Sequence, residues 1–333
     1  MSKTTTILTS LARIAITLVL ALVALVACLW LALRQPNWGE HPFANGARAD
    51  RAALRQHVKV LCNEYSPRNP RHLQQLNAAA DYIKRQLSLT NAKVSEQAYL
   101  AGGVTCRNII ARFGPDTGPL LVVGAHYDVY GDLPGADDNA SGVAGVLELA
   151  RLLQTRKLTA PVELVAFSTE EPPFFGGAQM GSAVHAQSLA ERKIAVSAMI
   201  SLEMIGYFTD GPVHLDPPLN FIYPESGNFV VAAGRWQDRK LAKEIKKLFR
   251  GANDLPCFSY SGPTMLGADL SDHRSYWPYD IPAVMVTDTA HLRNHNYHTP
   301  NDTPDTLDYA RMADVVDGVL SAVIHLSANP DTP

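Results

Sequence analysis

Short apolar runs alternate with helical patterns over most of this 333-residue chain. The run from Leu120 to Ala125 is almost wholly apolar, which is typical of a strand buried on both faces of a sheet. Gly142 to Leu153 then has helical spacing, and Val162 to Phe167 has the composition of a further strand. This alternation predicts an α/β fold with a mixed, mostly parallel sheet that carries helices on both faces.

The remaining elements extend the same pattern. We expect further helices at Ala49 to Cys62, His72 to Leu87, Ala183 to Glu191, Gln237 to Phe249 and Tyr309 to Leu326. We expect further strands at Lys93 to Tyr99, Cys106 to Phe113, Ala198 to Leu202, Phe229 to Ala233 and Ile281 to Thr287. The sequence contains no internal repeat and no convincing boundary after residue 49, so one domain is predicted over residues 50–333.

Histidines and carboxylates follow the ends of the expected strands. Because ligands of such sheets bind at the carboxyl ends of the strands, these side chains should meet at one edge. The five candidate metal ligands are His126, Asp138, Glu171, Glu203 and His298. Imidazole and carboxylate ligands without thiolate suit two zinc ions with open positions, although other divalent metals would also fit. Glu170, beside Glu171, is free to act as a base.

Several neighbours could orient these ligands. Asp128 lies two residues after His126, on the same side of an extended chain, and could accept the second N–H of the imidazole. Asp302, four residues after His298, is a candidate to orient that histidine as a partner behind the metal ligand. The competing interpretation of the Asp137–Asp138 turn is a cap of the following helix. We expect His185 and His214 at the surface, and His291 and His295 in a solvated or substrate-side loop.

These motifs resemble family 28 of the metallopeptidases, which contains the bacterial zinc leucyl aminopeptidases and the glutamate carboxypeptidases. The resemblance covers about residues 105–326 and implies the zinc-exopeptidase (phosphorylase/hydrolase-like) fold. It implies that His126 and Glu203 hold one zinc, and that Glu171 and His298 hold the other. It further implies that Asp138 bridges the two ions and that Glu170 is the general base.

The segment Ser271-Asp-His273, followed by Trp277, resembles the family's segment beside the substrate pocket. Asp272 and His273 are therefore expected near the substrate or behind the ligands. Some aminopeptidases of the family have a tyrosine just before this segment that stabilises the oxyanion. The corresponding stretch here, Gly267 to Leu270, contains no tyrosine, so the sequence identifies no oxyanion donor.

The function implied is that of a dinuclear zinc exopeptidase that removes N-terminal residues from peptides, with metal-activated water and a glutamate base. One alternative is a glutaminyl cyclase, a transferase of similar fold that uses a single zinc. A carboxypeptidase or dipeptidase of the same family is another, with Arg274 and Arg293 as candidates for the substrate carboxylate, although both are expected to be surface cations. A scaffold protein without metals should lack some ligands, and none is missing here.

The segment from Ile14 to Leu33 contains no charged residue, and as a helix it would span about 30 Å, the thickness of a bilayer core. Lys3 and Arg13 precede it, which favours a cytoplasmic tail and a catalytic domain outside the cytoplasm. The division expected is a tail (1–13), a transmembrane anchor or signal segment (14–34) and a linker (35–49). The alternatives are a lipoprotein acylated at Cys28 and a secreted protein.

The net charge of −3 gives no indication of nucleic-acid binding. The densest basic run, Lys240 to Arg250, has helical spacing and includes Glu244, as a solvated helix face does. The partners expected are peptides with a free N-terminus and, through the first helix, a membrane. Cys62, Cys106 and Cys257 cannot all pair with one another, and buried free thiols explain them as well as a disulfide does.

Overall fold

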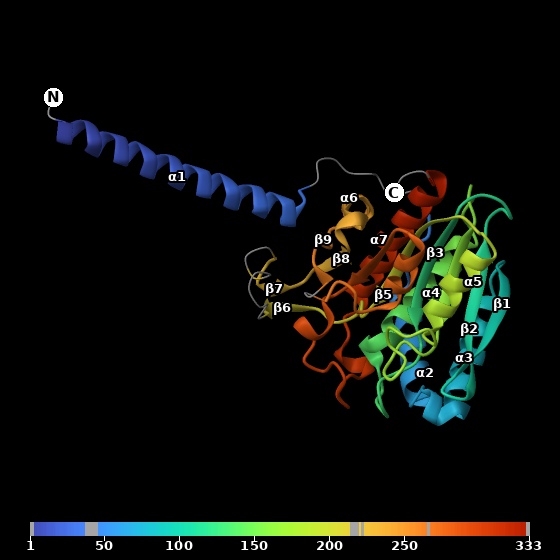
Figure 1. The fold of residues 1–333 in the computed structure, drawn as a ribbon. Helices are drawn as coiled ribbons and strands as arrows, with labels where there is room; N and C mark the ends of the chain where they lie inside the picture. Colours follow the sequence, from blue (N-terminus) through green and yellow to red (C-terminus); the bar gives the residue numbers. More distant parts are fainter. Residues whose placement is uncertain (1–2, 37–45, 214–219, 221–222, 265–266, 331–333) are drawn as a thin grey trace. The chain divides into compact units, whose positions relative to one another are not determined.

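The computed structural model describes residues 3–36, 46–213, 220, 223–264 and 267–330 (Figure 1). The chain divides into two compact units, residues 1–36 and 37–333, each of which is described by itself. His214 lies outside the described residues, and so do residues 37–45 of the expected linker. Residues 46–49 belong to the second unit, where Arg48 donates to the carbonyl of Ala252 and Ala49 N–H donates to Asp317.

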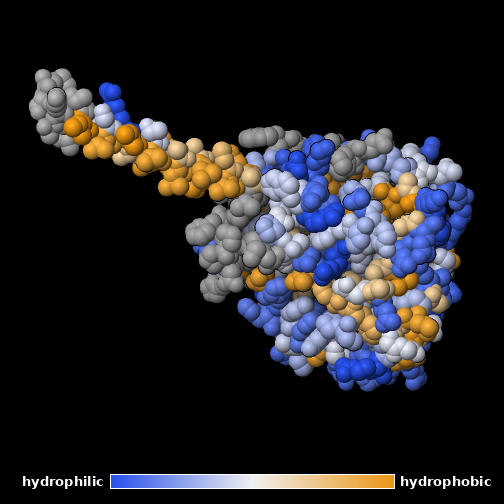
Figure 2. All heavy atoms as spheres, viewed as in Figure 1, coloured by the Kyte–Doolittle hydropathy of each residue, from blue (hydrophilic) through white to orange (hydrophobic). Residues whose placement is uncertain are grey.

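The first unit is one helix, α1 (Lys3–Arg34). Its segment Ser10–Ala32 has a mean hydropathy of 2.9 and is long and apolar enough to cross a membrane, properties that a signal sequence shares. Apolar side chains cover most of its described surface in Figure 2, whereas the visible face of the second unit is mixed. The first unit is therefore an apolar N-terminal helix, either a signal sequence or an anchor.

The second unit contains the expected alternation of strands and helices. Its helices are α2 (Arg51–Glu64), α3 (Leu73–Ser88), α4 (Gly142–Leu153), α5 (Gly181–Glu191), α6 (Arg239–Ala252) and α7 (Tyr309–Ala328). The strands of its main sheet are β1 (Lys93–Ala101), β2 (Val104–Phe113), β3 (Leu120–His126), β4 (Val162–Phe167), β5 (Val196–Glu203), β8 (Val230–Gly234), β9 (Cys257–Ser261) and β10 (Ala283–Thr287). The strands β6 (Thr209–Pro212) and β7 (Ser226–Gly227) form a separate small sheet.

The main sheet has the order β1-β2-β4-β3-β5-β10-β8-β9. The four central strands β4, β3, β5 and β10 are parallel, whereas β1, β2 and β8 contribute the antiparallel pairs. The predicted fold class, a mixed and mostly parallel sheet, is confirmed. Because β4 and β5 follow β3 in the chain but lie on opposite sides of it, the strand order reverses at β3, where α/β sheets place their ligand crevice.

Helices cover both faces of this sheet (Figure 1). The larger core packs α2, α3, α4, α6 and α7 against one face, and a smaller core packs α5 and the 3₁₀ segment Asp272–Tyr279 against the other. Side chains of β3 alternate between the two: Val123 and Ala125 face the larger core, whereas Leu120 and Val122 face the smaller. Burial on both faces explains why β3 is almost wholly apolar.

The cysteines of this unit are free and buried. Burial raises the pKa of the Cys62 and Cys106 thiols to about 11 and that of Cys257 to about 12. They are therefore small buried side chains rather than disulfide partners. Cys28 lies exposed on α1.

Candidate metal centre

The candidate ligands lie at the carboxyl-terminal edge of the parallel strands. His126 is the last residue of β3 and Glu203 the last residue of β5. Glu170 and Glu171 follow β4 by three and four residues, and His298 lies in the long loop after β10. Asp138 lies between β3 and the start of α4. Residues spread over 173 positions thus meet at the edge predicted from the strand pattern.

Two groups of side chains form around the histidines. His126 Nε2 lies 3.3 Å from Asp138 Oδ1 and 3.3 Å from Glu203 Oε2. His298 Nε2 lies 3.0 Å from Asp138 Oδ2 and 3.3 Å from Glu171 Oε1. Asp138 therefore turns one carboxylate oxygen to each histidine, as a ligand shared by two ions would.

Glu170 lies beside the group around His126 and is not part of the group around His298. Its Oε2 atom lies 3.9 Å from His126 Nε2, farther than the oxygens of Asp138 and Glu203. Together with His126 and Glu203 it makes one cluster compact enough for a metal ion, and Asp138, Glu171 and His298 make the other. Glu170 thus lies beside the first group, farther from His126 Nε2 than Asp138 and Glu203 do.

Hydrogen bonds to the backbone fix the loops that carry these ligands. Asp128 Oδ1 accepts a hydrogen bond from the N–H of Glu170, and Asp128 Oδ2 accepts one from the N–H of Glu171, both at 3.1 Å. His126 Nδ1 lies 3.2 Å from the carbonyl oxygen of Asp128 and 3.6 Å from its Oδ1. Asp128 therefore orients three candidate residues, the imidazole mainly through its backbone.

Asp302 has a different role from the one expected. Its carboxylate accepts hydrogen bonds from the N–H groups of Asp137 and Asp138, at 2.8 and 3.1 Å. The expected pairing with His298 was wrong, because both oxygens are directed at the backbone of the Asp138 loop. The side chain of Asp137 points away from Asp138, since it accepts from the N–H of Gly206 and from Asn294 Nδ2.

Glu203 is held by a chain of two serines. Ser271 Oγ donates to Glu203 Oε2 at 2.8 Å, and Ser201 Oγ lies 2.7 Å from Ser271 Oγ. Ser271 begins the segment whose next two residues were expected near the site. Asp272 and His273 are fully buried behind the ligands, where His273 Nε2 lies 2.8 Å from the carbonyl oxygen of Ala268.

Three residues at the ligands have left-handed backbone conformations although they are not glycine. They are Thr169 (φ 59°), Met204 (φ 50°) and His298 (φ 54°). Such conformations cost roughly 1–3 kcal/mol each and persist only where surrounding contacts impose them. Thr169, a β-branched residue, is held by hydrogen bonds to the carbonyl of Gln179 and to the hydroxyl of Tyr99. Part of the backbone strain of the described chain therefore lies at this site.

The carboxylates repel one another in the absence of a cation. Burial raises the pKa of Glu171 to about 8, and the Asp138 carboxylate adds to the shift. Burial also raises the pKa of Glu170 well above its usual value; His126 opposes this shift, whereas Glu203 adds to it. Buried groups of one sign are stable only with compensation. A pair of divalent cations would supply it.

The atoms left without partners fit such cations. Glu171 Oε1 and His298 Nε2 are buried, and within the part of the chain that the structure describes neither atom has a hydrogen-bond partner. They face each other at 3.3 Å, and unsatisfied buried polar atoms of this kind require an explanation such as an ion. Imidazole nitrogen and carboxylate oxygen are zinc ligands, so the donors present fit zinc in both groups.

Aromatic rings surround His298. The ring of Tyr130 stacks on one of its sides at a centroid distance of 4.1 Å, and the ring of Tyr297 stacks at 3.8 Å. Burial raises the pKa of Tyr297, and the carboxylates of Asp138 and Glu171 are the next causes. Its phenol is therefore neutral and close to the ligands. Tyr297 was not among the expected site residues, although it directly precedes His298 in the sequence.

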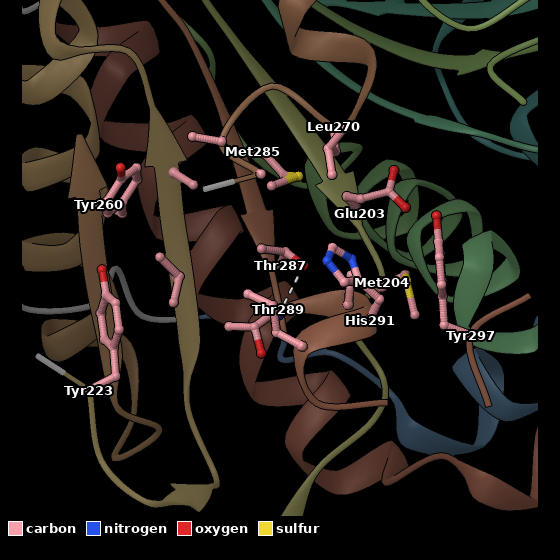
Figure 3. Close-up of a pocket in the computed structure, with 16 residues that line it drawn as sticks. Glu203, Met204, Tyr223, Tyr260, Leu270, Met285, Thr287, Thr289, His291 and Tyr297 are labelled. Atoms are coloured by element: carbon pink, nitrogen blue, oxygen red, sulfur yellow. Dashed lines mark hydrogen bonds between the residues drawn. The ribbon is translucent and has the colours of Figure 1, made fainter. Parts of the chain in front are cut away.

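An apolar pocket opens beside Glu203 (Figure 3). The space between its walls is about 740 Å³, a figure that includes open solvent. Its apolar and aromatic lining consists of Met204, Tyr223, Val231, Ala233, Tyr260, Ala268, Leu270, Met285, Ala290, Leu292 and Tyr297. In Figure 3, Glu203 and Tyr297 lie at one end and Tyr260 and Tyr223 at the other. The pocket therefore leads from the candidate metal centre into an apolar space.

Two expected surface residues are buried. His185 is 2% exposed, because its Nδ1 contacts the hydroxyl of Tyr276 at 2.7 Å and its Nε2 lies 3.3 Å from Glu163. Arg293 is 1% exposed and donates to the carbonyl of Phe229. The expectation of a surface position was wrong for both, since their partners are distant in sequence. Arg274 is half-buried, with its guanidinium over the ring of Phe175.

The family model described as Peptidase family M28 matches residues 108–323. The chain belongs to peptidase family M28. The chain is 44% identical over 280 residues to the uncharacterized protein YfbL of Escherichia coli K12. The alignment covers 80% of this chain and 86% of that protein. The family resemblance inferred from the motifs is thereby confirmed.

Other comparisons connect the M28 chain to aminopeptidases. It is 30% identical over 258 residues to leucine aminopeptidase 1 of Blastomyces gilchristii, covering 70% of this chain and 60% of that longer protein. The fold is similar to the crystal structure of the Legionella pneumophila LapA aminopeptidase, with a TM-score of 0.69 and 23% identity. That match covers 84% of this chain and 72% of LapA. At this identity the structural likeness establishes the zinc-exopeptidase fold alone.

Proposed function

We propose that this M28 peptidase is an aminopeptidase that uses two zinc ions. One zinc would be held by His126 and Glu203 and the other by Glu171 and His298, with Asp138 between them. The observation that carries the proposal is the division of the Asp138 carboxylate, whose two oxygens lie 3.3 and 3.0 Å from the two histidines. Two zinc ions supply, when bound, Lewis-acid chemistry that polarises a carbonyl and lowers the pKa of water.

The protein's own groups would then move the proton and stabilise charge. Glu170, 3.9 Å from His126, would take a proton from the attacking water at its carboxylate and return it to the nitrogen of the leaving amine. The neutral hydroxyl of Tyr297 would donate a hydrogen bond to the carbonyl oxygen as negative charge develops there. In Figure 3 this hydroxyl is turned to the same end of the pocket as the Glu203 carboxylate.

The apolar pocket would bind the side chain of the N-terminal residue. Its lining of methionine, leucine, valine and tyrosine side chains favours a large apolar residue such as leucine or phenylalanine. Burial of such a side chain contributes about 1.5–3 kcal/mol, so kcat/KM should exceed that for glycine roughly 10- to 100-fold. The same preference is consistent with the name of the fungal relative, leucine aminopeptidase 1.

The apolar helix α1 supports a location at a membrane. We propose that residues 14–34 anchor the protein and that residues 50–333 form a catalytic domain outside the cytoplasm, with 1–13 as a tail and 35–49 as a linker. Release of a soluble form by signal cleavage, or acylation at Cys28, would be detected by mass spectrometry of the mature N-terminus. A mature chain that begins at Cys28, as acylation would require, or at any later residue would contradict the anchor.

The decisive experiment is a substrate panel with the full-length protein in detergent. Leucine amide, phenylalanine amide, glycine amide, glutamine amide, N-acetyl-leucine amide and an N-acetylated dipeptide with a free carboxylate are compared with and without a chelator, followed by zinc. Cleavage of the free but not the acetylated amides, lost with the chelator and restored by zinc, is expected. Cyclisation of an N-terminal glutamine with one zinc per chain would instead identify a cyclase. Release of C-terminal residues would identify a carboxypeptidase, and either result would overturn the proposal.

A further inference from the structure

The two candidate histidine ligands are oriented in different ways. A metal-binding histidine ordinarily fixes its ring through a hydrogen bond at the nitrogen that does not touch the metal. His126 has such a contact, since its Nδ1 lies 3.2 Å from the carbonyl oxygen of Asp128. For His298, no hydrogen bond within the described part of the chain reaches Nδ1. Its ring orientation must therefore come from another source.

The surroundings of His298 leave its ring less restricted than that of His126. Its side chain is 23% exposed, whereas that of His126 is 1% exposed. It lies in a loop between the 3₁₀ turns Ala290–Leu292 and Pro304–Thr306, with a left-handed φ of 54°. A partly exposed ring on an irregular loop would have several orientations unless neighbouring groups restrict it.

Two tyrosines supply that restriction. The Tyr130 ring is almost parallel to the imidazole, at an interplanar angle of 6° and a centroid distance of 4.1 Å. The Tyr297 ring also stacks on it, at 16° and 3.8 Å. Tyr130 belongs to the loop between His126 and Asp138, so it connects His298 to the segment that supplies the other group's ligands.

We propose that Tyr130 is a positioning residue that holds His298 by ring stacking and thereby sets the affinity of the second zinc. The inference rests on the proposed two-zinc site and goes beyond it, because it assigns a role to a residue that is not one of the candidate ligands. Tyr130 is 42% exposed, so its replacement removes little from the core. Tyr297 also stacks on His298, but its place in the lining of the apolar pocket makes it unsuitable for the test.

The test is calorimetric zinc titration of the metal-stripped, full-length protein in detergent. His298→Ala identifies which binding step belongs to the His298 ion, because that step should disappear. Tyr130→Ala should weaken this step about tenfold and leave the other step unchanged. Tyr130→Phe keeps the ring and should restore the affinity to within about twofold. Tyr279→Ala is the control, because Tyr279 is similarly exposed (39%) but ends the segment Asp272–Tyr279. Its zinc affinity should equal that of wild type.

Each result has a defined meaning. Loss of affinity in Tyr130→Ala alone supports the stacking role. An unchanged isotherm in Tyr130→Ala overturns it, and so does an equal loss in Tyr130→Phe, which would assign the effect to the hydroxyl. An equal loss in Tyr279→Ala also overturns it, as a non-specific effect. A wild-type isotherm with a single zinc would instead overturn the two-zinc site on which the inference rests.

Discussion

The Oδ2 atom of Asp302 accepts a hydrogen bond from the backbone N–H of Asp138 at 3.1 Å, across 164 residues of sequence. The Oδ1 atom of the same carboxylate accepts one from Asp137 at 2.8 Å. The loop that carries His298 therefore fixes the backbone of the loop that carries the proposed bridging ligand. Movement of either loop would be transmitted to both candidate zinc positions.

The first prediction concerns this link. Asp302→Asn keeps one acceptor oxygen but replaces the other with an NH₂ donor directed at a backbone N–H. We expect zinc affinity to fall about tenfold or more, as replacement of groups behind metal ligands generally causes. Zinc titration checks this, with Asp305→Asn, an exposed aspartate of the next turn, as the control. Equal affinity in wild type and Asp302→Asn would show that the link is dispensable.

The second prediction concerns the proposed general base. Glu170→Gln should lower kcat by about 10²- to 10⁴-fold, because a positioned base contributes that much, while the zinc content stays at two ions per chain. Steady-state rates on leucine amide and metal analysis of the same samples check it. A variant that loses zinc would assign Glu170 to the ligands, and one that keeps the wild-type rate would remove it from the mechanism.

The third prediction concerns the proposed oxyanion donor. Tyr297→Phe keeps the ring on His298 and removes the hydroxyl, so kcat should fall about 10²- to 10³-fold with KM changed much less. Initial-rate kinetics over a range of leucine amide concentrations separate the two parameters. Tyr279→Phe serves as a matched loss of one hydroxyl from an exposed tyrosine. A rise in KM at constant kcat would mean that Tyr297 contributes only to substrate binding.

The fourth prediction concerns acid stability away from the site. Burial lowers the pKa of His57 to about 4, and its Nδ1 lies 2.7 Å from the hydroxyl of Tyr82. The unfolded chain, in which histidine has a pKa near 6.5, binds more protons than the folded one between these values. The His57 contribution is therefore complete above pH 6.5 and is lost as the pH falls toward 4.

Urea unfolding between pH 4.5 and 7.5 checks this contribution. The free energy of unfolding of wild type should fall more steeply below pH 6.5 than that of His57→Phe, which lacks the titrating ring. Both proteins are loaded with zinc at each pH, so that the site's own titration is common to them. Parallel curves for the two proteins would contradict the assignment.

Much of the fold follows from the sequence because the central strands are buried on both faces. The apolar runs at β3 and β4 had no competing interpretation, and α4 and β4 have the predicted bounds. Strand β9 was not expected, since its sequence Cys-Phe-Ser-Tyr-Ser contains serines, and Ser259 and Ser261 are nevertheless buried. Tertiary packing outweighed the polar pattern there.

The proposed ligands were predictable because each follows a strand that ends at the same edge. The residues that hold these ligands in place were harder to predict from the sequence. Asp302 binds backbone N–H groups, which carry no residue-specific signal in a sequence. The stacking of Tyr130 and Tyr297 on His298 depends on the path of two loops, and ring contacts of this kind have no characteristic spacing.

The buried cysteines of the second unit have a consequence for the surroundings in which the protein can work. A thiol reacts as its thiolate, and Cys62, Cys106 and Cys257 are enclosed and remain protonated at neutral pH. Oxidants and alkylating reagents therefore meet no reactive thiol among these three cysteines, and the fold does not depend on a disulfide between them. The folded peptidase unit should tolerate an oxidising exterior and a reducing interior equally well.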